Sequence, residues 1–379
     1  MYEMIDRYVR YLIDHSTPRQ TAWNMELIRE GRTGTWNYID GCMLNALIAL
    51  GDISGDDKLF AFAESVLDAY VQEDGSILTL KTELHRLDDI NEGRALFPAW
   101  QRTGKEKYRR ATETLKAMLD AQPRTDEGSY WHKQIYTQQV WLDGIYMAQP
   151  FMALFEREFG NQDYSDILKQ VRIVRKRMRD EKTGLYYHGY DSSKSMYWAD
   201  KETGLSRSFW LRSIGWFSIA LADLIEIIPE KAVQHEIGAI LRDLMASIAV
   251  YADPETGMYY QVVDQGSREG NYLESSGSSM VAYAMMKGAR LGILDVEFAE
   301  KGKKTFDGII RTCLKAEGEN IGLTNICLVS GLGDSNGKPR DGSYEYYISE
   351  PVVCNDAKGV APFVLCYSEI RQMLSGEVS

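Results

Sequence analysis

Long segments with two different hydrophobic patterns alternate along the chain. One kind carries a single apolar stripe at i, i+3/i+4 spacing, as in Leu59–Tyr70, Ile167–Met178 and Val233–Ile248. The other kind is apolar almost all round, as in Trp216–Ile228 and Met280–Leu291. A single stripe is typical of a helix that covers a core, whereas a helix that is apolar on every side lies inside the protein. We therefore expect six striped outer helices to alternate with six buried ones.

A short polar or aromatic motif that reaches a glycine precedes each buried segment. The copies are Trp36–Gly41, Asp88–Gly93, Val140–Gly144, Trp210–Gly215, Leu273–Gly277 and, more weakly, Asn355–Gly359. Six hairpins of one outer and one buried helix close most simply into a double ring. The pattern thus predicts an all-α fold, an (α/α)6 barrel that occupies residues 1–379 as a single domain. Short strand-like stretches, such as 76–80 and 258–263, are expected in the loops.

All buried helices of such a ring run in the same direction, so their N-terminal turns meet at one mouth. Polar and aromatic residues that are far apart in the sequence should then surround one cavity. They are Tyr38, Asp40, Asp88, His132, Asp143, His188, Trp210, Arg212 and Glu274. A purely architectural role of the motif would explain the glycines, which permit close helix packing. It would not explain the acidic and aromatic residues beside them.

Asp143 is the first candidate for acid chemistry. It stands in an apolar and aromatic segment between Leu142 and Gly144. Burial in such surroundings raises the pKa of a carboxyl group, as a general acid near neutral pH requires. The alternative is an N-cap, in which the carboxylate accepts backbone N–H bonds at the start of the helix. Asp88 and Asp40 have the same two interpretations.

Two histidines and one arginine are candidates for substrate binding. His132 and His188 lie in loops of similar form, and they are two of only five histidines in the chain. A loop histidine is often an incidental surface residue, but matching positions at one rim favour a site. Arg212, between Trp210 and Trp216, would suit bidentate binding of a carboxylate. Its alternative role is to satisfy helix ends.

Composition narrows the choice of partners. The formal net charge of −12 argues against nucleic acid, although a few cations in a pocket can still bind a small anion. No apolar run is long enough for a bilayer, no basic and apolar leader opens the chain, and the five cysteines are scattered. We therefore expect a cytoplasmic protein. The sequence has no HExxH motif and no phosphate-binding glycine loop, so we expect neither a metal nor a cofactor.

Aromatic residues cluster in short segments beside glycine and polar residues. The segments are Tyr130–Trp131, Tyr186–Tyr187, Tyr259–Tyr260 and Tyr344–Tyr347. They either fill the core or line a cleft. The last of them lies in a long insert, Gly331–Glu350, which suits a loop over the mouth or a surface loop.

In the order and spacing of these motifs, the chain resembles glycoside hydrolase family 105, the unsaturated rhamnogalacturonyl hydrolases. Family 88 unsaturated glucuronyl hydrolases are close relatives. The motifs that carry the resemblance are Trp36–Gly41, Asp88–Asp89, Trp131–Lys133, Trp141–Met147 with Pro150–Phe151, Gly184–His188, Trp210–Arg212 with Gly215–Trp216, and Glu274–Met280.

The resemblance implies a reaction unlike ordinary glycoside hydrolysis. The substrate is an oligosaccharide whose terminal uronate carries a C4=C5 double bond, which is a vinyl ether. An acid protonates C4, water adds at C5, and the hemiketal collapses to release an open-chain keto-uronate. The resemblance places the proton donor at Asp143, and the first expected substrate is an unsaturated galacturonyl-rhamnose from pectin.

Further roles are implied for the other motif residues. The substrate carboxylate is expected to be held by residues from the set His132, Lys133, His188 and Arg212. Trp210 and Trp216 are expected to form stacking walls. Tyr38, Asp40 and Asp88 are expected to bind sugar hydroxyls, and Asp88 also to orient the water or to act on Asp143.

Three other functions compete with this one. An inverting glycosidase would need two carboxylates roughly 6.5–9.5 Å apart. A sugar epimerase would depend on His132 and His188 for proton transfer. A non-catalytic glycan-binding protein would keep its binding without Asp143.

Overall fold

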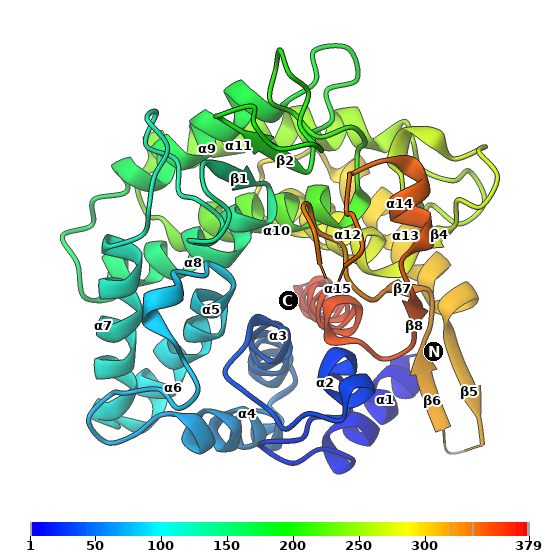
Figure 1. Cartoon of the computed structure of the whole chain (residues 1–379). Coiled ribbons are helices and arrows are strands. Elements are labelled where there is room, and N and C mark those ends of the chain that lie inside the picture. The colour runs from blue at the N-terminus through cyan, green and yellow to red at the C-terminus, as the bar shows by residue number, and fades with distance from the viewer. Residues whose placement is uncertain (1, 319, 336, 377–379) are drawn as a thin grey trace.

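The computed structural model describes residues 2–376 except 319 and 336, and it shows two concentric rings of helices (Figure 1). The inner ring consists of α3 (Tyr38–Ser54), the succession α5 (Asp88–Asn91), η2 (Glu92–Ala95) and α6 (Leu96–Thr103), then α8 (Asp143–Glu158), α10 (Leu211–Ile227), α12 (Ser275–Arg290) and α15 (Ala357–Gly376). Each member packs on the next, and α15 packs on α3, which closes the ring. The predicted (α/α)6 barrel is confirmed.

The outer ring covers the inner one. Its helices are α1 (Tyr2–Asp14), α4 (Asp57–Tyr70), α7 (Glu106–Asp120), α9 (Ser165–Met178), α11 (Lys231–Ala249) and α13 (Val296–Cys313). Each of the last five packs on the inner helix before it, and α1 reaches α15 through a 3.0 Å hydrogen bond from the Tyr367 hydroxyl to Asp6. The buried residues of α4 are those of its predicted stripe, whereas α10 is buried from Leu211 to Ile225.

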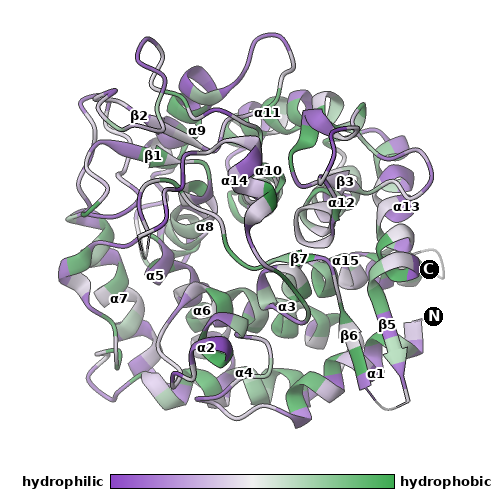
Figure 2. Cartoon of the chain, turned by 45° about the vertical axis from the view of Figure 1, so that its right-hand side comes forward, coloured by the Kyte–Doolittle hydropathy of each residue, from purple (hydrophilic) through white to green (hydrophobic). Residues whose placement is uncertain are grey.

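Short elements fill the loops. They are the helices α2 (Met25–Glu30), η1 (Thr82–Leu84), η3 (Val263–Gln265) and α14 (Tyr344–Ser349), and the strands β1 (Gln139–Trp141), β2 (Gly189–Asp191), β3 (Tyr259–Tyr260), β4 (Leu273–Glu274), β5 (Leu314–Glu317), β6 (Asn320–Leu323), β7 (Ile326–Cys327) and β8 (Val352–Val353). In the described part of the chain the strands form antiparallel pairs only. In Figure 2 the rim loops are largely hydrophilic, while hydrophobic stretches follow the helices of the ring.

Two expectations about the loops need correction. The stretch 76–80 is not a strand, because it pairs only through the single bridge between Val71 and Ile77. The hairpin of β5 and β6 had not been predicted. Of the stretch 258–263, Tyr259 and Tyr260 do form β3. Among the described residues, no helix combines the length and apolarity that a membrane crossing needs.

The motif glycines bring inner helices into close contact. A Cβ on Gly41 of α3 would lie 2.5 Å from the Cα of Glu92 in η2. A Cβ on Gly277 of α12 would lie 2.4 Å from the side chain of Leu211 in α10. Because real Cβ atoms do not approach other atoms so closely, a larger residue would push these helices apart. The glycines therefore have the architectural role that the sequence left open.

A buried charged layer joins three inner helices below the mouth. Asp223 of α10 accepts hydrogen bonds from Arg94 at 2.7 Å, from Lys287 at 2.8 Å and from the Tyr283 hydroxyl at 2.9 Å. Burial works against ionisation of Asp223, but Lys287 and Arg94 outweigh it and lower its pKa to about 2. The layer fixes α10, α12 and η2 relative to one another beneath the cavity.

Candidate active site

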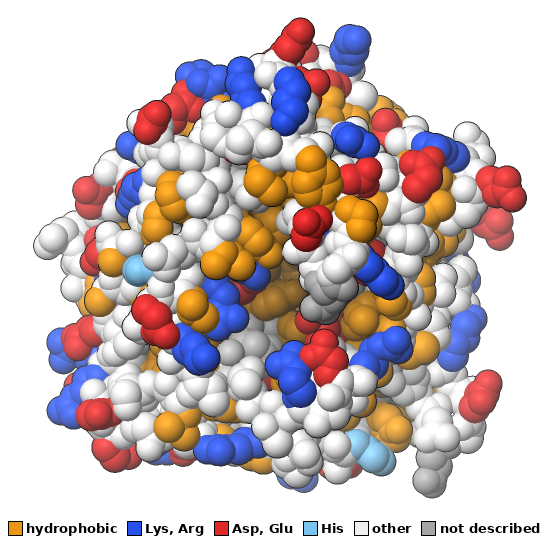
Figure 3. All heavy atoms as spheres, viewed as in Figure 1, with side chains coloured by type: hydrophobic (Ala, Val, Ile, Leu, Met, Phe, Trp, Pro, Cys, Tyr) orange, Lys and Arg blue, Asp and Glu red, His pale blue; other side chains and the backbone are white. Residues whose placement is uncertain are grey.

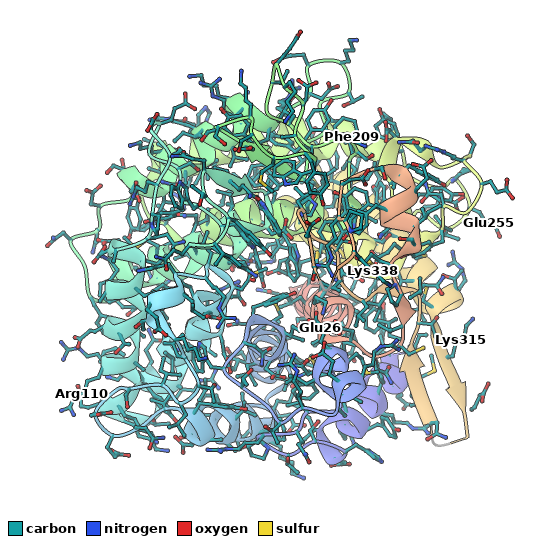
Figure 4. The ribbon with its side chains drawn as sticks, viewed as in Figure 1. Glu26, Arg110, Phe209, Glu255, Lys315 and Lys338 are labelled. Atoms are coloured by element: carbon teal, nitrogen blue, oxygen red, sulfur yellow. The ribbon has the colours of Figure 1, made fainter. Side chains whose placement is uncertain are left out.

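A cavity of about 440 Å³ opens at the N-terminal ends of the inner helices. It is lined from α2, α3, α5, α8, the loop before β1 and the segment after β7; the lining includes Glu26, Tyr38, Asp88, His132, Lys133, Tyr136, Trp141, Asp143, Ser330, Gly331 and Arg340. Figure 3 shows the hollow at the centre of this face, with hydrophobic, basic and acidic side chains around it. Glu26 lies near the middle of the ring, far from the outer positions of Arg110 and Lys315 (Figure 4).

Asp88, the first residue of α5, is held by two basic side chains. Its carboxylate lies 2.7 Å from Lys133 Nζ and 3.3 Å from His132 Nε2. Burial works against ionisation of this group, but Lys133 and His132 outweigh it and hold the pKa of Asp88 well below its usual range. Lys133 in turn is kept charged, because burial is outweighed by Asp88 and the pKa of the ammonium group is raised. Asp88 is therefore a fixed anion at neutral pH.

Aromatic rings stack into one wall of the cavity. The Trp141 ring lies 4.6 Å from the His132 ring and 4.8 Å from the Tyr136 ring, with interplanar angles of 11° and 16°. The Trp141 indole N–H donates to Gln139 Oε1 at 3.2 Å. A flat wall with polar edges is the surface that the face of a sugar ring contacts in carbohydrate sites. Tyr136 belongs to it although the sequence did not single it out.

Asp143, the first residue of α8, has different surroundings. Among the described residues no basic side chain of lysine or arginine pairs with it, and no backbone N–H caps onto its carboxylate. Its closest partner is His188, whose Nε2 lies 3.4 Å from Asp143 Oδ2. The capping alternative is therefore wrong for this residue. Asp143 lines the cavity, and among the described residues only His188 lies close to its carboxyl group.

His188 is enclosed behind Asp143. Its side chain is fully buried, its Nδ1 lies 2.8 Å from the Tyr347 hydroxyl, and the Trp210 ring lies 4.6 Å away. Trp210 also stacks on Tyr347 at 5.8 Å. His188 and Trp210 therefore support the wall behind Asp143 and do not line the cavity.

Arg212 and Glu274 form an ion pair below the cavity. Their side chains are 1% and 0% exposed, and their closest atoms are 3.6 Å apart. Arg212 also donates to Ser276 Oγ at 2.9 Å and to the carbonyl oxygen of Cys327. Glu274 caps α12 by accepting from Gly277 N at 2.7 Å. Arg212 was expected to bind the carboxylate of the substrate, but it binds the carboxylate of Glu274. This interaction connects α10 and α12 to β7.

The segment after β7 covers the mouth. Gly331, Ser335 and Arg340 line the cavity, and Arg340 Nε lies 3.5 Å from Glu350. Gly331 N donates to the Tyr346 hydroxyl at 2.9 Å, which fastens the segment to α14. The insert 331–350 is thus the expected loop over the mouth; Asn336 lies outside the described residues.

The family of the chain follows from comparison with known proteins. A family model, Glycosyl Hydrolase Family 88, matches residues 4–374. The chain belongs to this glycosyl hydrolase family. A solved glycoside hydrolase of family 105 from C. acetobutylicum is 40% identical, covers 91% of this chain and 97% of its own, and superimposes with a TM-score of 0.87. The resemblance to these two families is confirmed, and the protein is a glycoside hydrolase.

Other relatives of this hydrolase match over part of the chain or in fold. Protein Atu3128 of Agrobacterium fabrum is 36% identical over 229 residues, 59% of this chain and 97% of that protein. Unsaturated rhamnogalacturonyl hydrolase YesR of Bacillus subtilis is 28% identical over 216 residues, 54% of this chain and 59% of that protein. The unsaturated glucuronyl hydrolase structure from Bacillus sp. GL1 is 14% identical, covers 89% of this chain and 86% of its own, and shares the fold at a TM-score of 0.65.

In this glycoside hydrolase, half of the predicted site residues line the cavity. They are Asp143, Asp88, Tyr38, His132 and Lys133. Burial and the nearby acidic groups Glu26 and Asp88 raise the pKa of Tyr38 well above its usual value, so the phenol stays neutral. A neutral phenol can both donate to and accept from a sugar hydroxyl.

Asp40 does not reach the cavity. Its carboxylate accepts hydrogen bonds from Thr21 at 2.7 Å, Trp23 at 2.8 Å, Asn24 at 3.2 Å and Asn37 at 2.7 Å. With both oxygens occupied it fastens the segment before α2 to α3, and it faces a separate hollow beside Thr21. The expected role in binding sugar hydroxyls does not fit this position.

Trp216 lies in the core. Its ring is 2% exposed and stacks on Tyr146 of α8 at 4.6 Å. It stands one helical turn after Arg212, which places it about 6 Å further into the barrel. The aromatic wall that lines the cavity consists of Trp141 and Tyr136 instead.

Besides Tyr136, three further residues at or behind the cavity had not been predicted individually. Glu26 of α2 binds Lys358 at 2.6 Å, and the cations Lys358, Arg212 and Lys133 outweigh burial and lower its pKa. Tyr347 contacts His188, and Arg340 reaches the rim. Tyr347 had a signal in the sequence, since it ends the aromatic segment 344–347, and Arg340 lies in the insert 331–350; Glu26 had none.

Proposed function

We propose that this hydrolase releases the terminal 4,5-unsaturated uronic acid from lyase-generated oligosaccharides, with Asp143 as the proton donor to C4. The observation that supports the proposal is that the two carboxylates in the cavity have different partners. Asp88 is paired with Lys133 at 2.7 Å, whereas Asp143 has no lysine or arginine partner among the described residues.

Asp88 is a poor proton donor because its pKa is held well below the usual range. It is better suited to accept a hydrogen bond from a sugar hydroxyl or from the attacking water. Asp143 lies in the cavity wall at the start of α8, 8% exposed, with no hydrogen bond that a substrate would have to break. A general acid must face the atom that it protonates, so Asp143 is the better candidate by geometry.

The steps follow from the substrate's vinyl ether. The Asp143 O–H transfers its proton to C4, and the electron pair of the double bond forms the new C–H bond. Positive charge develops at C5 and the ring oxygen, water adds at C5, and the proton that this water loses restores the acid form of Asp143. The hemiketal then opens, the bond from C1 to the leaving sugar breaks, and a keto-uronate is released. One acid is sufficient, because hydration of the double bond needs no carboxylate nucleophile.

Lys133 is proposed to hold the substrate carboxylate. Its ammonium group has three N–H donors, and Asp88 occupies the direction of one contact only. Arg29 and Arg340 add further cations to the cavity lining. The carboxylate is conjugated with the double bond, so a cation beside it also orients C4 toward Asp143.

The sugar after the uronate is proposed to be rhamnose, as in rhamnogalacturonan fragments. One support is the name of the relative YesR, an unsaturated rhamnogalacturonyl hydrolase. Another is space: a second hollow of about 470 Å³ shares Glu26, Tyr38, Asp88 and Lys133 with the cavity. A disaccharide or longer product of a lyase thus has room beyond the uronate.

The test is the loss of ultraviolet absorbance of the conjugated uronate. Wild-type protein and Asp143→Asn are mixed with unsaturated galacturonyl-rhamnose, unsaturated glucuronyl disaccharides and a saturated galacturonyl-rhamnose. Loss with wild type on unsaturated substrates, and none with Asp143→Asn, supports the reaction and its acid. Release of sugar from the saturated disaccharide would favour an ordinary glycosidase. A preference for the glucuronyl substrate would overturn the proposed rhamnogalacturonyl specificity.

A further inference from the structure

The pair of Asp143 and His188 has a third member that the proposed reaction does not use. Tyr347 of α14 reaches His188 Nδ1 with its hydroxyl at 2.8 Å, while His188 Nε2 faces Asp143 Oδ2 at 3.4 Å. Tyr347 is not among the residues that line the cavity. We propose that Tyr347 is a positioning residue, which fixes the tautomer of His188 and thereby aims the Asp143 proton at the substrate; this rests on the proposed function.

Hydrogen-bond counting selects one tautomer. Among the described residues the Tyr347 hydroxyl has no partner other than His188 Nδ1. If this hydroxyl donates to Nδ1, the imidazole proton sits on Nε2 and points at Asp143 Oδ2. The opposite tautomer leaves the phenolic hydrogen without an acceptor and sets the Nε2 lone pair against a carboxylate oxygen. The hydrogen bond at one ring nitrogen therefore decides what the other presents.

The surroundings keep Tyr347 a neutral donor. Burial, together with Tyr346, Asp143 and Asp341, raises the pKa of the Tyr347 phenol well above its usual value. Its ring stacks on Trp210, and its backbone carbonyl accepts from Gln261 Nε2 at 3.1 Å. The hydroxyl is thus held in place from two sides.

The two carboxyl oxygens of Asp143 then have different roles. Oδ2 is buried and faces His188, so an N–H donor there leaves the transferable proton for Oδ1. After the transfer the same N–H stabilises the carboxylate that remains. The separation of 3.4 Å is long for a hydrogen bond, as is common in catalytic pairs before the substrate closes the site. The other titratable groups that line the cavity are Glu26, Arg29, Glu30, Tyr38, Asp88, His132, Lys133, Tyr136 and Arg340.

Tyr346 provides a matched control. It is the neighbouring tyrosine and it is also buried, but its hydroxyl accepts from Gly331 N at 2.9 Å and interacts with Glu350 instead of a histidine. Tyr346→Phe therefore removes the same atom from the same helix without touching His188. A loss seen in Tyr347→Phe alone cannot come from loosening of α14 in general.

The first arm of the experiment is kinetic. We expect Tyr347→Phe to lower kcat by about 10–100-fold with KM little changed, the size typical of removing a group that orients another. Tyr346→Phe should not show this selective fall in kcat. A wild-type kcat in Tyr347→Phe, or equal changes in both variants, would overturn the proposal.

The second arm needs no substrate. Long-range proton–nitrogen spectra of histidine-labelled protein report each tautomer, and His188→Asn assigns the resonance among the five histidines. We expect an Nε2–H imidazole at His188 in wild type and in Tyr346→Phe, and a mixture in Tyr347→Phe. An Nδ1–H form in wild type would contradict the proposal. If instead the wild type shows the expected tautomer but turns over no unsaturated uronide, the proposed function fails and the positioning of His188 stands.

Discussion

Two neighbouring hairpins of the barrel use the same construction to hold a carboxylate at the mouth. Asp88 and Asp143 are each the first residue of an inner helix, and each faces a histidine from the loop before the next inner helix. The backbone agrees as well. The N-cap residues Leu87 and Leu142 donate to the carbonyl oxygens of His132 and His188 at 3.1 and 2.9 Å, respectively.

The two regions differ in the residue that comes after the histidine. In the first region this residue is Lys133, whose ammonium group lies 2.7 Å from Asp88. In the second it is Gly189, which has no side chain and where a Cβ would displace the Leu332 side chain, 2.3 Å away. The second region adds Tyr347 behind its histidine, whereas Nδ1 of His132 has no hydrogen-bond partner among the described residues. The same backbone arrangement thus holds Asp88 as an anion beside Lys133 and, one hairpin later, holds Asp143 without a lysine or arginine partner among the described residues.

Replacing the carboxylate by an amide in each region should have the largest effect on activity. Asp143→Asn removes the proton donor, and we expect kcat to fall by about 10³–10⁴-fold, within the range that general acids contribute. Because His188, at 3.4 Å, is the only close polar partner of the Asp143 carboxylate among the described residues, Tm should stay close to wild type. Steady-state absorbance kinetics and thermal unfolding measure both.

Asp88→Asn is the matched control in the sister region. We expect a smaller fall in kcat, about 10²-fold, at the low end of what a positioned acid or base contributes. The Tm should also fall, since Lys133 and His132 lose their acceptor. A larger fall in kcat for Asp88→Asn than for Asp143→Asn would reverse the assignment of the donor.

Removing the cation should make the first region resemble the second. In Lys133→Met we expect kcat/KM to fall by about 10–100-fold, the cost of a lost charge-assisted contact to a carboxylate. Lys133 outweighs the effect of burial on Asp88 and helps to hold its pKa low, so its removal raises that pKa. Asp88 works as an anion, so activity should now be lost on the acid side at a higher pH than in wild type.

The pH profile of kcat/KM separates this effect from a general loss of binding. Lys133→Arg keeps the charge and should keep the acid limb near its wild-type position. An unchanged acid limb in Lys133→Met would show that the ionisation of Asp88 does not limit the reaction.

Trp141 is the wall that both regions share. Its ring stacks on His132 at 4.6 Å and meets His188 edge-on at 5.4 Å. Trp141→Phe keeps an aromatic ring but loses area and the bond to Gln139, so we expect kcat/KM to fall by about 3–10-fold, the equivalent of one stacking contact. An effect confined to kcat, with KM unchanged, would indicate that the ring orients the histidines without contacting the sugar.

Asp40 tests the boundary of the site with the smallest expected change in activity. Asp40→Asn replaces an acceptor of four hydrogen bonds by a group that must turn one N–H toward a donor. We expect a loss of about 1–3 kcal/mol in the free energy of unfolding and an unchanged kcat. A fall in kcat with wild-type stability would show that Asp40 takes part in the reaction.

The ring could be predicted from the sequence because burial sets the hydrophobic pattern. An outer helix buries one side only, as the buried residues Leu59, Ala63 and Val66 of α4 show, and its other side faces solvent. The inner helix α10 is instead enclosed by neighbours on every side. The hairpin of β5 and β6 escaped prediction because its strands are short and its residues Lys315 to Glu317 are exposed and largely polar.

The site could be predicted only as far as the starts of the inner helices. Tyr38 and Asp40 are both in the first turn of α3, yet two residues along a helix turn a side chain by about 200°, so Asp40 points away from Tyr38. The depth of Trp216 and the internal partner of Arg212 likewise depend on packing between helices. The pairing of Tyr347 with His188 joins segments that no local pattern connects.

The role of Asp143 can be tested through the position of the first proton delivered to the substrate. Wild-type enzyme turns over an unsaturated galacturonyl-rhamnose in D2O, and the reaction is quenched in its first turnovers, before the ketone exchanges its C4 hydrogens. We predict one deuterium at C4 in a single configuration, and no product from Asp143→Asn. Product without deuterium at C4, or C4 deuteration that persists in Asp143→Asn, would contradict a single acid at Asp143.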